Sequence, residues 1–210
     1  MSGSGTKDDP WQLSTPPGTS SYSIYRDDSI EPPILVCVVG KTTLTYQARC
    51  LDDLHAMLSD PEHMRGYPEP FDREGSLAWL ERQIAGYEDP GYALWIVEDR
   101  TTGEFLGTAG PALRVVEGVD EVEVGWHTRP GRKGEGIAPE AGAAARDWAF
   151  ANLDVDHVIS LVRPENQPSC RVAEKIGMHV DREADYKGFN HRVYWIDRVT
   201  WVRGGEGGPR

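Results

Sequence analysis

Apolar residues recur along this chain with two periods, the alternation typical of strands and the wider spacing typical of one helix face. Alternating and short apolar runs predict strands at Ile34–Val39, Thr43–Arg49, Tyr92–Glu98, Phe105–Ala109, Glu121–His127, His157–Arg163, His179–Ala184 and His191–Trp201. The wider spacing predicts helices at Asp52–Leu58, Asp72–Tyr87, Ile137–Leu153 and Ser169–Ile176. Strands and helices interleave in this order, which predicts a mixed α/β or α+β domain.

The two ends of the chain show neither period. Met1–Pro33 consists largely of Gly, Ser, Thr, Pro and Asp, and the chain closes with GGEGGPR. Such segments bury too little apolar surface to offset the conformational entropy that folding costs. We therefore predict a flexible or atypical segment at residues 1–40, a single domain at 41–203 and a flexible tail at 204–210.

Composition and charge exclude several classes of protein. Lys and Arg number 22 against 34 Asp and Glu, so the net charge is −12, without the basic face that a nucleic-acid partner requires. The three cysteines are too few and scattered for a disulfide framework. The N-terminus lacks the apolar core of a secretory signal, and no apolar run approaches the ~20 residues that cross a bilayer. These features predict a cytoplasmic protein with no membrane partner.

The most informative stretch is Glu121–Glu140 (EVEVGWHTRPGRKGEGIAPE), which joins a predicted strand, a turn and the start of a helix. Within the strand, Glu121, Glu123 and His127 share one face, and the apolar residues Val122, Val124 and Trp126 share the other. One face is thus suited to a core, and the other presents carboxylates and an imidazole.

The turn after this strand, Pro130–Gly136, holds three glycines, Arg132 and Lys133 immediately before the helix. Glycine lets the backbone approach a ligand closely, and the first N–H groups of a helix have no partner inside it. Together with the helix dipole, they favour a pyrophosphate. The turn matches neither nucleotide-binding motif, because G-x-x-x-x-G-K-[ST] is absent and Pro139 stands where G-x-G-x-x-G needs its third glycine. A turn that serves only a tight corner is the alternative.

These residues resemble the GNAT superfamily of acetyl-CoA-dependent N-acetyltransferases, in particular the branch of the ribosomal-protein N-terminal acetyltransferases. That branch has E-x-G-[YW] on a strand followed by D-P-x-x-x-G-x-G-x-A-x-E-A, and this chain has EVGW at 123–126, Arg129-Pro130 and GEGIAPEA at 134–141. A second signature, N-x-x-S-x-R-V-x-E-K-x-G-F, matches residues 166–178, with Met178 in place of Phe. Ala173 stands where other branches carry a tyrosine that protonates the leaving thiolate. The resemblance covers about residues 42–201.

The resemblance implies the GNAT fold, an α/β (α+β) arrangement whose central, mixed and mostly antiparallel twisted sheet is flanked by helices. The sheet is expected to splay between its fourth and fifth strands. The implied reaction is direct attack of a primary amine on acetyl-CoA, the co-substrate, in a ternary complex that contains no metal.

The resemblance also assigns site residues. Because an alkylammonium has a pKa near 10.4 and must lose a proton before it attacks, Glu123 is the expected base, acting through a water. Ser169 is the expected donor to the leaving thiolate, unless it only caps its helix, and Asn166 could likewise be a simple turn residue. Backbone N–H groups around Trp126 and His127, freed where the strand bulges and splays from its neighbour, would hold the oxyanion. The residues expected to contact the co-substrate are Trp126, His127, Thr128, Arg132, Lys133, Gly134, Glu135, Gly136, Ile137, Ala138, Asn166 and Ser169.

The acceptor is expected to be a small-molecule amine or a protein N-terminus, and the protein a monomer or homodimer. Ala173 and the first forty residues keep one alternative open, a non-catalytic acyl-CoA-binding or protein-interaction module of the same fold.

Overall fold

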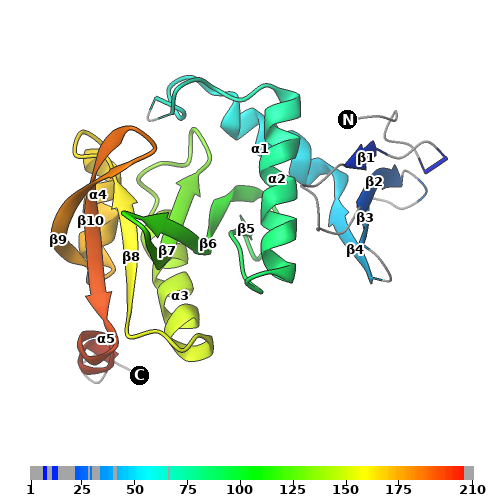
Figure 1. Ribbon diagram of the computed structural model, residues 1–210. Coiled ribbons are helices and arrows are strands. Elements are labelled where there is room, and N and C mark those ends of the chain that lie inside the picture. The colour runs from blue at the N-terminus through cyan, green and yellow to red at the C-terminus, as the bar shows by residue number, and fades with distance from the viewer. Residues whose placement is uncertain are drawn as a thin grey trace. The chain divides into compact units, whose positions relative to one another are not determined.

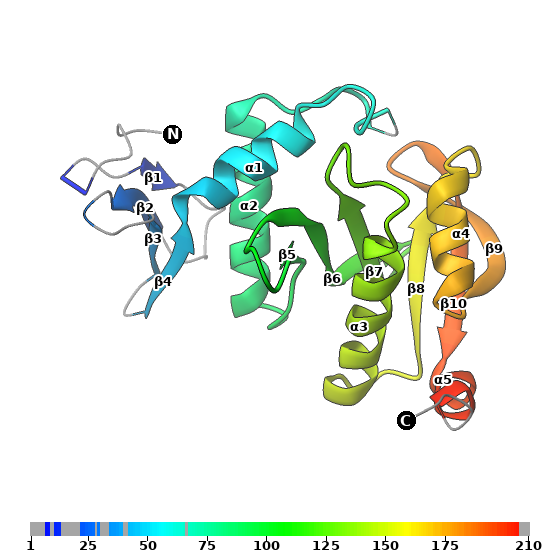
Figure 2. The same ribbon diagram turned by 180° about the vertical axis from the view of Figure 1, so that it is seen from behind.

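The computed structural model describes residues 7–8, 11–13, 22–27, 29, 34–39, 42–65 and 67–205 (Figures 1 and 2). The chain forms two compact units, Met1–Ala56 and Met57–Arg210. In the first unit, a four-stranded antiparallel sheet has the order β1-β2-β3-β4. Its strands are β1 (Trp11–Leu13), β2 (Tyr22–Asp27), β3 (Ile34–Val39) and β4 (Thr42–Gln47), and helix α1 (Ala48–Leu58) follows them.

Strand β3 confirms the predicted strand, whereas β1 and β2 lie in the stretch where no element was predicted. The alternation in β2 is too short to stand out from its Ser-rich and Pro-rich surroundings, because Tyr22 and Ile24 are the only apolar residues two positions apart in its sequence. Helix α1 begins four residues earlier than predicted, which shortens the strand predicted over Thr43–Arg49. The predicted flexibility of residues 1–40 falls mostly outside the described residues.

The second unit contains a six-stranded sheet in the order β5-β6-β7-β8-β10-β9. Its strands are β5 (Trp95–Glu98), β6 (Phe105–Val116), β7 (Val119–Thr128), β8 (His157–Val162), β9 (His179–Tyr186) and β10 (Phe189–Asp197). Neighbouring strands are antiparallel except for β7 and β8, which are parallel. The predicted mixed, mostly antiparallel sheet is therefore confirmed. The first of the seven strands predicted in 41–203 is β4, which belongs to the other sheet.

The helices of this unit are α2 (Arg73–Glu88), α3 (Ile137–Asn152), α4 (Gln167–Lys175) and α5 (Arg198–Gly205). Figure 2 shows α3 and α4 in front of the sheet, and both helices contribute to one core with the buried faces of β7, β8 and β10. Ala145, Ala149 and Phe150 of α3 meet Val124 and Tyr194 there. Small alanine side chains let the helix lie close to the strands.

Helix α5 was not predicted, and Trp201 belongs to it rather than to the last strand. Asp197 ends β10, because its Oδ1 accepts the Thr200 N–H at 2.5 Å in the manner of a helix N-cap. The Arg198 guanidinium also donates to the carbonyl oxygens of Leu153 and Val155 at 2.9 Å, which ties the start of α5 to the loop before β8. No helix among the described residues has both the length and the apolar character needed to cross a bilayer.

Candidate active site

The two parallel strands β7 and β8 separate soon after they meet. Their register consists of one pair, Glu123↔Ile159, whereas β7 pairs with β6 from Val119 to Thr128 without interruption. The bulge predicted near Trp126 is therefore wrong, and the predicted splay between the fourth and fifth strands lies at β7 and β8.

The hydrogen-bond pattern of β7 determines which backbone groups face the splay. The Arg129 N–H donates to the Leu106 carbonyl at 2.8 Å, so the odd-numbered residues of β7 bond to β6. Even-numbered residues turn toward β8, as the Val124 carbonyl does when it accepts the Ser160 hydroxyl at 2.6 Å. By the same alternation, Trp126 directs its N–H into the space between the separating strands. The splay alone, without a bulge, therefore leaves the Trp126 N–H directed away from β6.

The turn before α3 keeps the open helix start that its sequence predicts. Gly131, Gly134 and Gly136 have φ values of 86°, 90° and 88°, in the left-handed region that favours glycine. A Cβ on any of the three would meet no atom within 4 Å, so the conformation of the backbone, rather than crowding, requires glycine. Gly136 is the N-cap of α3 and offers no capping side chain, which leaves the N–H groups of Ile137 and Ala138 directed out of the helix end. This arrangement fits a diphosphate.

The two cations of this turn have different surroundings. The Arg132 Nη1 lies 2.5 Å from Glu104 Oε2, and its Nε lies 2.9 Å from Glu135 Oε2. Two carboxylates thus already neutralise Arg132. Lys133 lies near His63, since its charge helps to lower the pKa of that imidazole.

Helix α4 places Asn166 and Ser169 together at its N-terminus. Asn166 is the N-cap, and its Oδ1 accepts the Ser169 N–H at 3.3 Å. The alternative in which Ser169 caps the helix is therefore wrong, and the cap is Asn166. The side chains of Cys170 and Ala173 face the core, and the two residues are 2% and 0% exposed.

The two faces of β7 differ as predicted. Trp126 packs on α3, where a Cβ at Gly142 would lie 3.2 Å from its ring, and Thr128 ends the strand opposite Gly107. On the other face, Glu123 Oε2 accepts the Arg114 Nε at 2.7 Å, and the carboxylate side chain is 14% exposed.

Glu121, on the same face, takes part in a separate buried ion pair. Its Oε2 lies 2.7 Å from His157 Nε2, and its Oε1 lies 3.5 Å from Arg182 Nη2. These contacts make Glu121 a structural residue that connects β7, β8 and β9.

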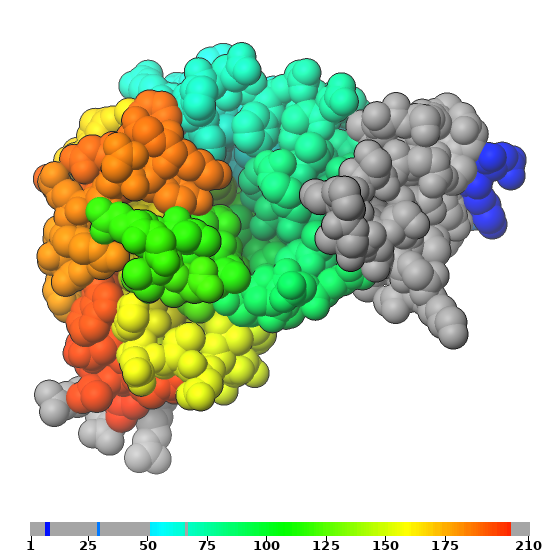
Figure 3. Space-filling view, in the orientation of Figure 1, coloured from blue at the N-terminus to red at the C-terminus, as the bar shows by residue number. Residues whose placement is uncertain are grey.

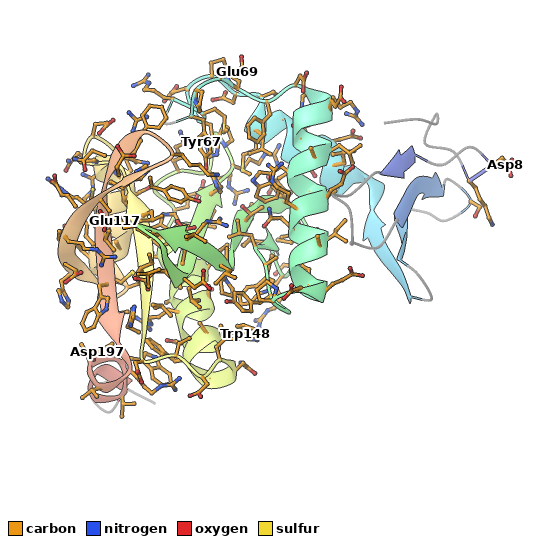
Figure 4. All side chains as sticks on the ribbon, viewed as in Figure 1. Asp8, Tyr67, Glu69, Glu117, Trp148 and Asp197 are labelled. Atoms are coloured by element: carbon orange, nitrogen blue, oxygen red, sulfur yellow. The ribbon has the colours of Figure 1, made fainter. Side chains whose placement is uncertain are left out.

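His127 joins two residues that sequence reasoning did not select, His63 and Tyr67, both in the segment between α1 and α2. His127 Nδ1 lies 3.2 Å from His63 Nε2, and His127 Nε2 lies 3.4 Å from the Tyr67 hydroxyl. Figure 4 shows Tyr67 near the tip of β7 and the β9–β10 hairpin. The only local signal was their spacing of four residues in a segment without an apolar period, which identifies no site.

Burial changes the acid–base properties of this group. Loss of hydration, followed by the nearby His63 and Arg114, lowers the pKa of His127 to about 3. Burial, followed by the charge of Lys133, lowers the pKa of His63, although Asp60 opposes this change. Loss of hydration around its hydroxyl raises the pKa of Tyr67 to about 12, with Glu123 adding to the shift. All three side chains are therefore neutral near pH 7.

Figure 3 shows a hollow in the surface between the green β6–β7 segment, the orange β9–β10 segment and the teal helix α2. Among the described residues, no cluster of three or more His, Cys, Asp or Glu side chains could hold a metal ion.

Comparisons with known proteins agree with this geometry. Residues 45–179 match the family described as "Acetyltransferase (GNAT) domain", and residues 3–65 match a family of unknown function, DUF6855. The chain is 34% identical over 143 residues to the uncharacterized protein YkkB of Bacillus subtilis (strain 168), covering 64% of this chain and 81% of YkkB.

Two solved structures share the fold. The acetyltransferase from Agrobacterium tumefaciens str. C58 has a TM-score of 0.63 and 23% identity, over 90% of this chain and 95% of that one. Spermidine N-acetyltransferase from Vibrio cholerae, in complex with CoA and spermine, has a TM-score of 0.59 and 16% identity, over 74% and 94%. Because the family match covers residues 45–179, more than half of the chain, and the splayed sheet is in place, the chain belongs to the GNAT family and is an N-acetyltransferase.

Proposed function

We propose that this protein transfers the acetyl group of acetyl-CoA to a primary amine by direct attack in a ternary complex. The observation that carries the proposal is the separation of β7 from β8 after the single pair Glu123↔Ile159, beside a glycine turn that leaves the start of α3 open. We assign the activity to residues 41–203, with residues 1–40 and 204–210 outside the catalytic domain.

The co-substrate would lie between the splayed strands, with its diphosphate at the start of α3. Acetyl-CoA supplies a thioester carbonyl that an amine can attack. The Trp126 N–H would polarise that carbonyl, and Ser169 would donate to the sulfur as it leaves. The contacts proposed for the rest of the co-substrate are His127 and Thr128 on β7, Arg132, Lys133, Gly134, Glu135, Gly136, Ile137 and Ala138 at the turn, and Asn166 at α4.

Glu123 is the carboxylate that we propose meets the acceptor ammonium. It lies on the face of β7 opposite α3, with one oxygen bonded to Arg114. Two roles are compatible with this position, a base that acts through a water and an ion-pair partner that holds the ammonium in place. The two roles predict different kinetics, because a base changes kcat at neutral pH and an anchor changes the KM of the amine.

The acceptor that we favour is a protein N-terminus, because the two signatures at 123–141 and 166–178 resemble the ribosomal-protein N-terminal acetyltransferases. A polyamine or another small amine is the competing acceptor, since a structural neighbour was solved with CoA and spermine. Both present an ammonium group near the carboxylate of Glu123.

Calorimetry with acetyl-CoA, combined with a thiol-release assay over a panel of amines, tests the proposal. The panel contains peptides that begin with Ser or Ala, polyamines and aminoglycosides. We expect acetyl-CoA to bind and at least one amine to be acetylated. Tight binding without turnover on any amine would instead make the protein a non-catalytic acyl-CoA-binding module, and failure to bind any CoA species would refute both.

A further inference from the structure

Three side chains from two distant parts of the chain form a continuous hydrogen-bonded row. The row runs from the Tyr67 hydroxyl to His127 Nε2 at 3.4 Å, and from His127 Nδ1 to His63 Nε2 at 3.2 Å. The ring centroid of His127 lies 6.1 Å from the ring centroid of Tyr67 and 5.4 Å from that of His63. Both nitrogens of the central imidazole are therefore engaged, one on each side.

The two ends of this row have different neighbours. The Tyr67 end interacts electrostatically with Glu123, the carboxylate proposed to meet the acceptor, and with Arg114 and Tyr186. The His63 end interacts with Lys133 and Asp60, and the Asp60 carboxylate also accepts the backbone N–H of His63 at 2.6 Å. The row thus leads away from the acceptor toward the glycine turn.

A neutral imidazole has one donor nitrogen and one acceptor nitrogen, so His127 imposes a direction on the row. In one state the Tyr67 hydroxyl donates to His127 Nε2, and His127 Nδ1–H donates to His63 Nε2. In the other state every bond is reversed. A proton that enters at one end converts the first state into the second and releases a proton at the other end.

We propose that Tyr67, His127 and His63 form a proton relay that removes the proton of the acceptor ammonium, and that Glu123 serves as the anchor of that ammonium. The proposal rests on the proposed function and assigns the base that the reaction requires. Tyr67 is the residue that touches the acceptor nitrogen, and His127 and His63 act through it.

The protons of the reaction balance along this route. One proton passes from the ammonium to the Tyr67 oxygen, while the phenolic proton moves to His127 Nε2, the His127 Nδ1 proton moves to His63 Nε2, and His63 releases its Nδ1 proton to water. The freed lone pair of the nitrogen forms the C–N bond, the C–S bond breaks, and the second proton of the nitrogen passes to the sulfur. After the product leaves, His63 takes up a proton from water at Nδ1, each bond of the row passes its proton back, and Tyr67 releases its proton to water in the emptied site, which restores the starting tautomers.

The surroundings of the row favour imidazoles that pass a proton on over imidazoles that remain protonated. Burial lowers the pKa of both imidazoles, and Lys133 beside His63 and Arg114 beside His127 lower them further, whereas Asp60 opposes the change. Neither ring therefore holds the proton near pH 7, so His63 passes it on to water. Glu123, in contrast, has one oxygen already bonded to Arg114.

Single and double variants test the relay with the acceptor found in the amine panel. We expect Tyr67→Phe, His127→Gln and His63→Gln each to lower kcat about 100-fold at pH 7, the size typical of general acid–base catalysis. Tyr67→Phe and His63→Gln, which are not among the proposed co-substrate contacts, should leave the affinity for acetyl-CoA unchanged. The loss should shrink above pH 9.5, where the free amine is abundant.

The double variant His63→Gln/His127→Gln should lose no more activity than either single variant, because one break already interrupts the row. His179→Gln, an exposed imidazole on β9, is the matched control and should retain activity.

Additive losses, or losses that do not change with pH, would overturn the relay and leave the proposed transferase activity standing. Absence of turnover by the unmodified protein would refute the proposed function instead. A measurement without turnover then decides the relay: in ¹⁵N spectra of the imidazoles, we expect His127 to stay neutral down to pH 4.5 and Tyr67→Phe to shift its Nε2 resonance. Protonation of His127 near its ordinary pKa of 6.5, with no response to Tyr67→Phe, would overturn the proposal.

Discussion

The two sides of the splayed strand β7 are built by different means. On the side proposed for the co-substrate, the relevant groups belong to the backbone, namely the glycine turn, the open start of α3 and the inward N–H of Trp126. On the side proposed for the acceptor, they are side chains from separate segments, namely Glu123 and His127 of β7 with His63 and Tyr67. The first side depends on φ angles that only glycine adopts easily, and the second on distances between side chains. Substitutions should therefore affect the two sides in different ways.

The largest effect is expected on the backbone-built side. Gly136→Asp should weaken acetyl-CoA binding more than 100-fold by calorimetry, because it adds a carboxylate to the proposed diphosphate site and strains a residue at φ 88°, at a cost of about 1–3 kcal/mol. Gly188→Asp, in the β9–β10 turn at φ 79°, introduces the same charge and a similar strain with equally open space around it. Equal loss of binding in both variants would mean that strain alone acts, and that the turn is not the diphosphate site.

The next effect concerns stability on the side-chain-built side. The pKa of His127 falls from 6.5 to about 3 on folding, so its contribution to stability is complete above pH 6.5 and is lost as the pH falls toward 3. Between pH 7 and 4, the free energy of unfolding should fall by roughly 2–3 kcal/mol more in the unmodified protein than in His127→Gln. Urea denaturation at the two pH values measures the difference. Parallel losses in the two proteins would show that His127 is not desolvated in the folded state.

A smaller effect separates the two roles of Glu123. As an anchor, Glu123→Gln should raise the KM of the amine about tenfold, or ~1.4 kcal/mol, and leave the pH profile of kcat unchanged. Glu117→Gln is the matched control, because Glu117 also pairs with an arginine, Arg182 at 3.6 Å, but is 53% exposed at the β6–β7 turn. A kcat that falls at pH 7 and recovers at high pH would instead make Glu123 the base.

The same contrast explains what could be predicted from the sequence. The glycine turn and both signatures are contiguous, so their residues could be named in advance, and the alternation of β7 correctly separated Trp126 from Glu123. The prediction of a bulge was wrong because the register of β7 with β6 and β8 depends on strands far away in the chain.

His63 and Tyr67 could not be found, because they lie about sixty residues from His127 and only the tertiary fold brings them together. Helix α5 was missed because the pattern of the last strand continues to Trp201 without a glycine or proline to interrupt it.

The smallest effect is expected for the two charged side chains of the glycine turn. Lys133 and Arg132 are neighbours in sequence, but Arg132 already contacts Glu104 and Glu135, so a diphosphate would have to compete with two carboxylates for it. Lys133→Gln should therefore weaken acetyl-CoA binding about fivefold at low salt, the size of one exposed charge interaction, and Arg132→Gln should weaken it by less. Calorimetry at two salt concentrations measures both, and the difference should shrink at high salt because exposed charges are screened. A larger loss for Arg132→Gln would mean that its two ion pairs break when the co-substrate binds, so that the side chains of this turn contribute as much as its backbone.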